Sequence, residues 1–202
     1  GPLIWEAFGL MTNDIPSCHR NNQPPTRFCM SEKSFLSSID QIPSEDWHQI
    51  MALRSEVFVV EQQCVYLDPD PKDLEATHLM RKEGDELIAY LRIIQSTAWH
   101  IGRIVVKGSQ RNTGLGKRMV EQAIAHCTST DANRSIEMSA QVYLCDFYRS
   151  LGFEAIGSMY LEDGIPHLRM VYQEPLKWCV DRTFRSFIRL FIAARMGESL
   201  AR

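Results

Sequence analysis

The sequence predicts an α/β (α+β) fold built as one domain. Its 202 residues and 23.2 kDa fit a single domain with an extension at each end. With 45% hydrophobic and 23% charged residues, the composition is that of an ordinary globular protein. Short apolar runs with strand character alternate with amphipathic stretches, and residues 101–127 read as an apolar strand, a glycine-rich turn and a helix.

Composition also narrows the class of protein. The net charge of −3 gives no field that would favour nucleic acid or a membrane surface, and no apolar run is long enough to span a bilayer. The six cysteines are scattered and form no Cys-x-x-Cys pair, which indicates free thiols in a reducing, cytoplasmic compartment. A zinc site at Cys18, His19 and Cys29 is disfavoured because it lacks a paired spacing, and no metal is expected.

The two ends are set apart from the domain, which is expected over 31–174. Residues 1–30 are expected to be a loosely ordered extension that starts with a protease scar, Gly1-Pro2-Leu3, and trimming of an organellar targeting segment is left open. Pro175 ends the pattern of the domain, and residues 175–202 are expected to form a basic amphipathic helix over 176–202. That helix could pack on its own domain, on a second protomer in a homodimer, or on an anionic membrane, which we consider the less favoured case.

The elements between these ends follow from periodicity and turn residues. A helix is expected from Ser44, its N-cap, to about Glu61, because acidic residues occupy its first turn and apolar residues recur at helical spacing. The proline- and aspartate-rich segment 65–73 is expected to be a loop, since it lacks the spacing of a calcium loop. A second helix is expected over 116–127 and a short third helix over 146–151. Strands are expected over 35–39, 77–81, 86–94, 99–106, 136–140, 153–160 and 166–172.

The turn before the second helix is suited to a phosphate group. The first N–H groups of a helix have no intrahelical partner and lie at the positive end of its dipole. Glycines at 114 and 116 keep Cβ atoms away from such a ligand. The pattern is not a Walker A loop, because Arg118 follows Lys117, and Met119 stands where a dinucleotide fingerprint has its third glycine.

What remains, Arg-x-x-Gly-x-Gly after an apolar strand, resembles the pyrophosphate loop of the GNAT N-acetyltransferase superfamily. The segment Val142–Phe153 is similar to that family's Ala-x-x-Phe-Tyr-x-x-x-Gly-Phe motif, although its small first residue is replaced by Val142 or Leu144. Residues 54–66 and 162–167 look like the ElaA-like branch. The resemblance covers about Phe35 to Tyr172 and implies a mixed, mostly antiparallel sheet flanked by helices and splayed between strands 4 and 5.

The resemblance also implies a reaction, the transfer of an acetyl group from acetyl-CoA to a primary amine in a ternary complex. Tyr148 matches the family's general acid, and a phenol can protonate a thiolate leaving group with little mismatch in pKa. The implied cofactor-binding residues comprise the strand that pairs with pantetheine, the loop that holds the diphosphate and one apolar ring: Ile104, Val105, Val106, Arg111, Asn112, Thr113, Gly114, Leu115, Gly116, Lys117 and Phe147.

The base that deprotonates the amine is left open. Glu61 and His167 are the first candidates, with Glu162 and Asp163 beside them. A ping-pong route through Cys145 is disfavoured, since a small buried cysteine is usually inert. A non-catalytic GNAT-fold module that senses CoA is the alternative function. The acceptor, a small-molecule or peptide amine, and the acyl-chain preference are not specified by the sequence.

Overall fold

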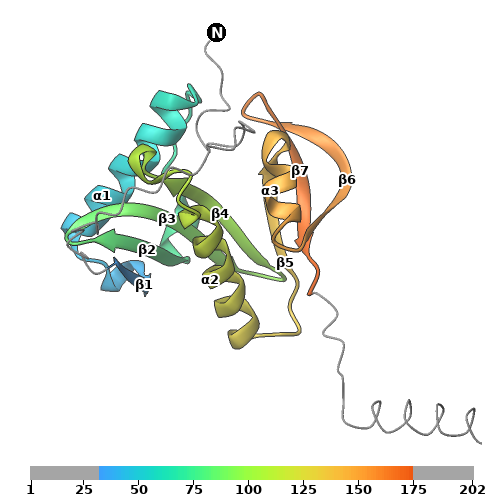
Figure 1. The fold of residues 1–202 in the computed structure, drawn as a ribbon, viewed down its shortest axis with the longest axis horizontal. Coiled ribbons are helices and arrows are strands. Elements are labelled where there is room, and N and C mark those ends of the chain that lie inside the picture. The colour runs from blue at the N-terminus through green and yellow to red at the C-terminus, as the bar shows by residue number, and fades with distance from the viewer. Residues whose placement is uncertain (1–31, 175–202) are drawn as a thin grey trace, which may run out of the picture.

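A computed structural model describes residues 32–174, and the expectations for 1–30, for 175–202 and for Cys18, His19 and Cys29 lie outside these residues. Figure 1 shows a central sheet with helices on its faces. The helices are α1 (Ser44–Arg54), α2 (Leu115–Thr130) and α3 (Cys145–Arg149). The strands are β1 (Glu32–Ser38), β2 (Thr77–Glu83), β3 (Glu86–Gln95), β4 (Trp99–Val106), β5 (Ile136–Gln141), β6 (Phe153–Glu162) and β7 (Ile165–Tyr172).

The seven strands form one mixed sheet in the order β1-β2-β3-β4-β5-β7-β6. All neighbours are antiparallel except β4 and β5, whose parallel pairing is limited to Trp99 with Ile136 and His100 with Glu137. Beyond that point β4 and β5 part. The expected splay between the fourth and fifth strands is therefore confirmed.

The parting of β4 coincides with a bulge. The register between β3 and β4 shifts between Tyr90 and Arg92, and Arg103 lies opposite this shift with φ 51°. A non-glycine residue at positive φ is uncommon, and a bulge bends the strand that carries it. The bulge thus accompanies the bend that turns the second half of β4 away from β5.

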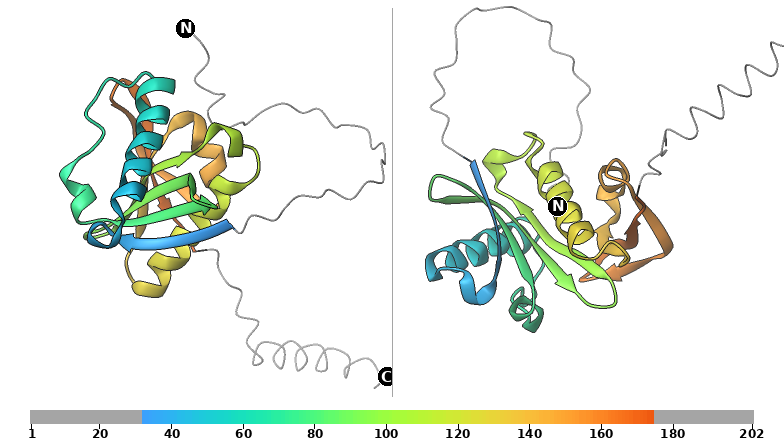
Figure 2. Two further views of the ribbon diagram at one scale, coloured as in Figure 1. Left: turned by 90° about the vertical axis from the view of Figure 1, so that its left-hand side faces the viewer. Right: turned by 90° about the horizontal axis from the view of Figure 1, so that it is seen from below.

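Two apolar cores lie on opposite faces of the sheet (Figure 2). The α2 face buries Met119, Val120, Ala123, Ile124 and Cys127, the five residues that the helical period predicts. The α1 face buries Ile50 and Leu53 against Val105 and Tyr90 of the sheet. Alternation along β3 and β4 supplies both faces, since both strands are covered on each side.

Sequence-based boundaries hold to within a few residues, with three differences. Pro43 rather than Ser44 is the N-cap of α1, and Ser44 is its first helical residue. The stretch expected to continue this helix is a π-helical segment, Ser55–Glu61. Ile39 leaves the first strand for a 3-10 turn, Ile39–Gln41. Both hairpin turns occur as predicted, with Asp163 and Gly164 at positive φ as a tight two-residue turn requires.

The loop before β2 is fixed by buried ion pairs. Arg54, fully buried, binds Asp68 (Nε to Oδ2, 2.7 Å) and Asp73 (Nη1 to Oδ1, 2.8 Å). Arg92 binds Asp73 at 2.7 Å and Asp70 at 2.8 Å. Asp70 also caps the 3-10 turn Pro71–Leu74 in a capping box with Asp73. The segment expected as a loop is therefore one wall of a rigid, charge-neutralised structure.

Candidate active site

The glycine-rich turn has the backbone geometry that an anion site needs. Gly114 is the N-cap of α2 at φ 76°, and the first helical bond runs from Arg118 N to Gly114 O at 3.1 Å. The N–H groups before it are therefore free of helical partners. A Cβ added at Gly116 would lie no closer than 3.7 Å to Val106, so nothing within the protein requires a glycine there. Because a Cβ here would make only ordinary contacts with Val106 and Phe147, a glycine at this position is compatible with the close approach of an external group, such as a diphosphate, to the helix start.

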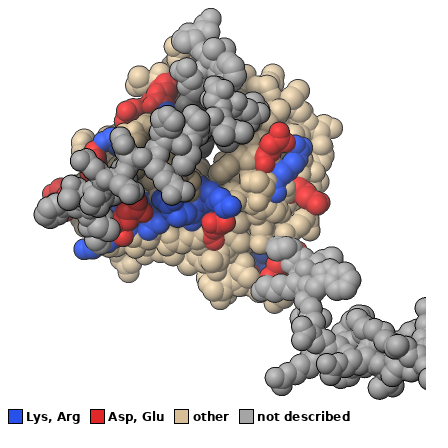
Figure 3. All heavy atoms as spheres, viewed as in Figure 1, with Lys and Arg blue, Asp and Glu red and all other residues tan. Residues whose placement is uncertain are grey.

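Basic side chains surround this helix start. Figure 3 shows Lys and Arg side chains gathered on the face where α2 begins. Arg111 links the end of β4 to the end of the π-helical segment. Its Nε donates to Val106 O at 3.1 Å, and its Nη2 pairs with Glu61 at 2.7 Å. Lys117 is half exposed and weakly paired with Glu121 at 3.9 Å. Their placement agrees with the anion site that the sequence predicts.

Substitutions of Gly116 and Gly114 are expected to affect ligand binding and stability differently. Gly116→Asp is expected to keep or slightly raise stability, because an acid in a first helical turn is favoured by about 0.3–1 kcal/mol. Its carboxylate should nevertheless weaken acetyl-CoA binding more than tenfold by repelling the diphosphate. Gly114→Ala should instead cost about 1–2 kcal/mol, since alanine is strained at positive φ. Calorimetry of binding and thermal unfolding would check both, with Asn133→Asp, an exposed change of equal charge, as control.

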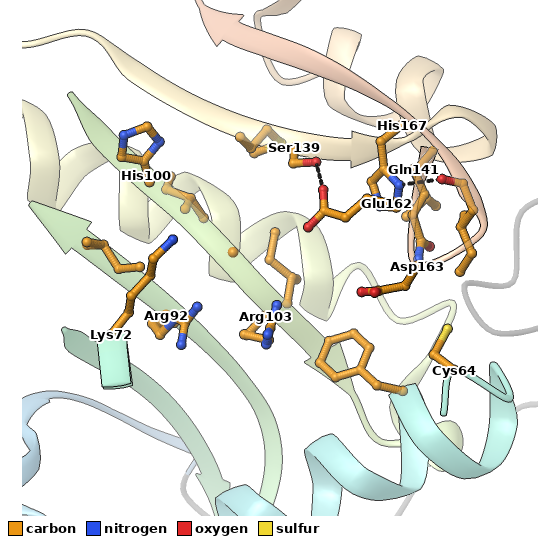
Figure 4. A pocket seen from close by; sticks show the side chains of 18 of the residues that line it. Cys64, Lys72, Arg92, His100, Arg103, Ser139, Gln141, Glu162, Asp163 and His167 are labelled. Atoms are coloured by element: carbon orange, nitrogen blue, oxygen red, sulfur yellow. Dashed lines mark hydrogen bonds between the residues drawn. The ribbon is translucent and has the colours of Figure 1, made fainter. Parts of the chain in front are cut away.

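The parted strands open into a cavity of about 510 Å³. Ile104 and Tyr148 line it, so one continuous opening joins the free edge of β4 to the tyrosine. Its other walls come from the end of the π-helical segment, the loop before β2, β5 and the β6–β7 hairpin (Figure 4). Residues from the first half of the domain, up to β4, thus meet residues from β5, α3 and the β6–β7 hairpin at one site.

Tyr148 is placed as a proton donor would be. Its ring is 4% exposed, packs edge-on against Phe147 and Phe153, and reaches the cavity. Its hydroxyl makes no hydrogen bond to any residue within 32–174. Burial raises the pKa of Tyr148, which keeps the hydroxyl protonated. The phenol is therefore a neutral donor whose hydrogen bond is available to a ligand.

His167 and Glu162 share the cavity wall opposite β4. The Nδ1 atom of His167 lies 2.8 Å from the carbonyl of Ile165, so Nδ1 must carry the proton that it donates. In the neutral ring Nε2 is then the proton acceptor. Glu162 accepts a hydrogen bond from Ser139 at 2.6 Å, and Ser139 also contacts Tyr160.

Glu61 and Cys145 lie elsewhere. Glu61 does not line the cavity and is paired with Arg111 of the turn before α2. The Cys145 thiol is buried outside the cavity and lies 3.9 Å from Gln141 O, and burial raises its pKa, which disfavours the nucleophilic thiolate. Of the acids and bases that the sequence predicts, Tyr148, Glu162, Asp163 and His167 line the cavity, whereas Glu61 and Cys145 do not.

The sequence analysis did not predict the ion pairs of Arg54, Arg92 and Arg103 beside the cavity. Arg103 packs over the rings of Phe58 and Tyr66, and its Nε lies 2.8 Å from Asp68. A signal was present, because Arg54, Arg92 and Arg103 each interrupt an apolar run while three aspartates crowd one loop. Charges in apolar segments require partners, so this pattern indicates buried ion pairs.

Comparison with known proteins defines the class. The acetyltransferase (GNAT) domain profile matches residues 48–174. A UPF0039 protein of Schizosaccharomyces pombe is 39% identical over 140 residues, 67% of this chain and 91% of that protein. The chain belongs to the GNAT acetyltransferase family.

Solved structures agree with this assignment. The crystal structure of Escherichia coli ElaA matches with TM-score 0.67 and 31% identity, over 71% of this chain and all of that one. An acyl-CoA N-acyltransferase from Pseudomonas aeruginosa matches with TM-score 0.68 and 33% identity over the same shares, 71% and 100%. An aminoglycoside 6′-N-acetyltransferase complexed with coenzyme A shares the fold alone, with 17% identity and TM-score 0.51 over 70% of this chain and 99% of that one. Within the described part of this chain, no helix is long and apolar enough to cross a membrane.

Proposed function

We propose that the protein transfers an acetyl group from acetyl-CoA to a primary amine. The observation that carries this proposal is the unpaired edge of β4, which runs from a helix N-terminus suited to a diphosphate into a cavity lined by Tyr148. An extended ligand can pair with such an edge through main-chain groups. Pantetheine, a chain of two amides, has the length and polarity for this pairing.

The cofactor would lie along residues that already have the required geometry. Ile104 lies on the edge of β4 that β5 has left, and the carbonyl of Val106 accepts from Arg111. Lys107 N–H bonds Ile88 O in β3, so strand alternation turns the backbone groups of Val105, two residues earlier, toward β3 as well. The turn 111–117 would hold the diphosphate. Phe147, whose ring reaches within 4.0 Å of a Cβ placed at Gly116, would pack beside the cofactor.

The reaction then follows from the cavity wall. The amine nitrogen attacks the thioester carbonyl, the new C–N bond forms, and the C–S bond breaks. Nε2 of His167, directly or through one water, takes the proton that the ammonium must lose before attack. Tyr148 donates its proton to the departing thiolate, and the second proton that the nitrogen loses as it becomes an amide restores the phenol, directly or through water. Direct transfer agrees with the buried Cys145 thiol, whose raised pKa disfavours an acetyl-cysteine intermediate.

Glu61 has a separate place in this proposal. Its ion pair holds Arg111 near the helix start, so it acts as a positioning residue for the cofactor. This function differs from that of a base, which needs contact with the amine.

His167→Gln and Glu61→Gln are expected to separate these two functions. The His167 variant should lower kcat by about 100-fold, the ordinary contribution of a positioned base, with the KM for acetyl-CoA unchanged. The Glu61 variant should raise the KM for acetyl-CoA several-fold with little change in kcat, because Arg111 loses its partner. Steady-state kinetics with both substrates varied would check this split. The reverse pattern would make Glu61 the base.

The proposal is tested by release of free thiol from acetyl-CoA across a panel of amines. Amine-dependent release with formation of the acetylated product supports the enzyme. Binding of acetyl-CoA without release for any amine would favour the alternative, a CoA-binding module without catalysis. The hydroxyl of Tyr148, which no partner occupies within residues 32–174, favours the enzyme because a sensor needs no proton donor.

A further inference from the structure

The cavity carries opposite charges on its two walls. Figure 4 shows Lys72, Arg92 and Arg103 on the side formed by β3, β4 and the turn before β2. Glu162 and Asp163 face them from the β6–β7 hairpin. A substrate between the walls meets acceptors for a cation on one side and donors for an anion on the other.

The acidic wall is suited to an ammonium group. Glu162 is held by Ser139 at 2.6 Å, which fixes one carboxylate oxygen and leaves the other available. Asp163 has neither an ion pair nor a hydrogen bond within the described residues. His167 lies on the same wall, so an amine drawn to these carboxylates is also next to the proposed base.

The basic wall, formed by Lys72, Arg92 and Arg103, offers few N–H donors that are held in place. Arg92 is neutralised by Asp70 and Asp73, at 2.8 and 2.7 Å. Arg103 is held between aromatic rings and pairs through Nε and Nη2 with Asp68 and Asp70, while its Nη1 makes no hydrogen bond to the described residues.

Lys72 is the cation on this wall that no carboxylate neutralises. Its backbone N–H is fixed by Asp70 at 2.9 Å, but its ammonium group makes no ion pair within residues 32–174. Glu75 also lines the cavity but makes no ion pair with Lys72 or with any other described residue. A positive charge without a partner at the edge of a cavity is available to an anionic ligand.

We infer that the acceptor substrate carries a carboxylate as well as the reacting amine, as a free amino acid or a short peptide does. Its ammonium group would lie against Glu162 and Asp163, beside His167, and its carboxylate would bind Lys72 and Nη1 of Arg103. This inference rests on the proposed acetyltransferase function. It excludes diamines and polyamines as preferred substrates, because their second cation would face Lys72.

A matched series of acceptors tests the inference. For chains of three to six carbons, ω-amino acids, their amides and the corresponding diamines differ only in the terminal group, and α-amino acids and their amides extend the series. The amino acid is expected to exceed its amide and diamine at least tenfold in kcat/KM for thiol release. Equal or better turnover of the amides or diamines would overturn the inference and leave the transferase function intact. Release from no member of the series but from other amines of the panel would also overturn the inference alone, whereas release from no amine at all would overturn both.

Two charge-reversal variants make the test specific to the basic wall. Lys72→Glu should shift the preference at least tenfold from amino acids toward diamines, since a negative charge now faces the second group. Lys33→Glu makes the same change in net charge on β1, at the far edge of the sheet, and should keep the wild-type preference. Thermal unfolding would show that both variants fold. An unchanged preference in Lys72→Glu would overturn the inference.

Discussion

Replacement of Tyr148 by phenylalanine is expected to lower kcat by about 100-fold or more while acetyl-CoA binds as before. A positioned general acid contributes about 10²–10⁴ in rate, and the variant removes only the hydroxyl. The ring contacts with Phe147 and Phe153 remain, so the fold should be kept. Thiol release at saturating acetyl-CoA and amine measures the effect.

The pH dependence and a neighbouring residue provide the controls. Because burial raises the pKa of Tyr148 above the ordinary value of about 10, wild-type turnover should show no loss from its ionisation below about pH 10. Tyr143, on the turn before α3, binds Gln141 and does not line the cavity. Tyr143→Phe should therefore retain most activity, and wild-type turnover in Tyr148→Phe would reject the proton-donor function.

Removal of Arg54 is expected to cause the largest loss of stability. Arg54→Ala removes a cation shared by two buried carboxylates and leaves each with one arginine, Arg103 for Asp68 and Arg92 for Asp73, so we expect a cost of about 3 kcal/mol, the lower end of the range for a broken buried pair. Chemical unfolding would measure it. Lys82→Ala breaks a more exposed pair with Asp46 and should cost less than about 1 kcal/mol. A loss in Arg54→Ala as small as that in the control would show that the network does not stabilise the fold.

The pH dependence of folding stability provides a second test of the ion pairs of Arg54. Burial alone would raise the pKa of the Asp73 carboxyl, but hydrogen bonds from Arg54 and Arg92 outweigh burial and lower it. A carboxyl with a lowered pKa in the fold stabilises it above its unfolded pKa of about 3.9, and that contribution is lost as pH falls through the folded pKa. The wild type should therefore lose stability below about pH 4, and Arg54→Ala should lose less over the same range.

Local patterns were sufficient to predict most of the fold. The 3.6-residue period of α2 and the turn residues Asp163 and Gly164 are local properties, and the structure has both as predicted. The pairing of the strands is not local; the resemblance to a family implied the mixed sheet and its splay, while the strand order comes from the structure. The π-helical segment after Arg54 escaped prediction because the same apolar stripe fits a continued α-helix.

In the candidate site, too, some residues could be predicted from local motifs and others could not. The glycine-rich turn and Tyr148 belong to short motifs whose chemistry can be read from residue types. The ion pairs of Arg103 depend on a bulge in β4 and on a loop some thirty residues earlier, as the separation of 33 positions from Asp70 shows. Contacts at such separation follow from tertiary packing, and spacing along the chain does not encode them.

Titration of the full chain with acetyl-CoA in a calorimeter tests most directly whether the start of α2 and the open edge of β4 hold this cofactor. The proposed function predicts saturable binding of one acetyl-CoA per chain, weakened more than tenfold by Gly116→Asp. Absence of binding heat across several temperatures, from protein that unfolds cooperatively, would contradict it.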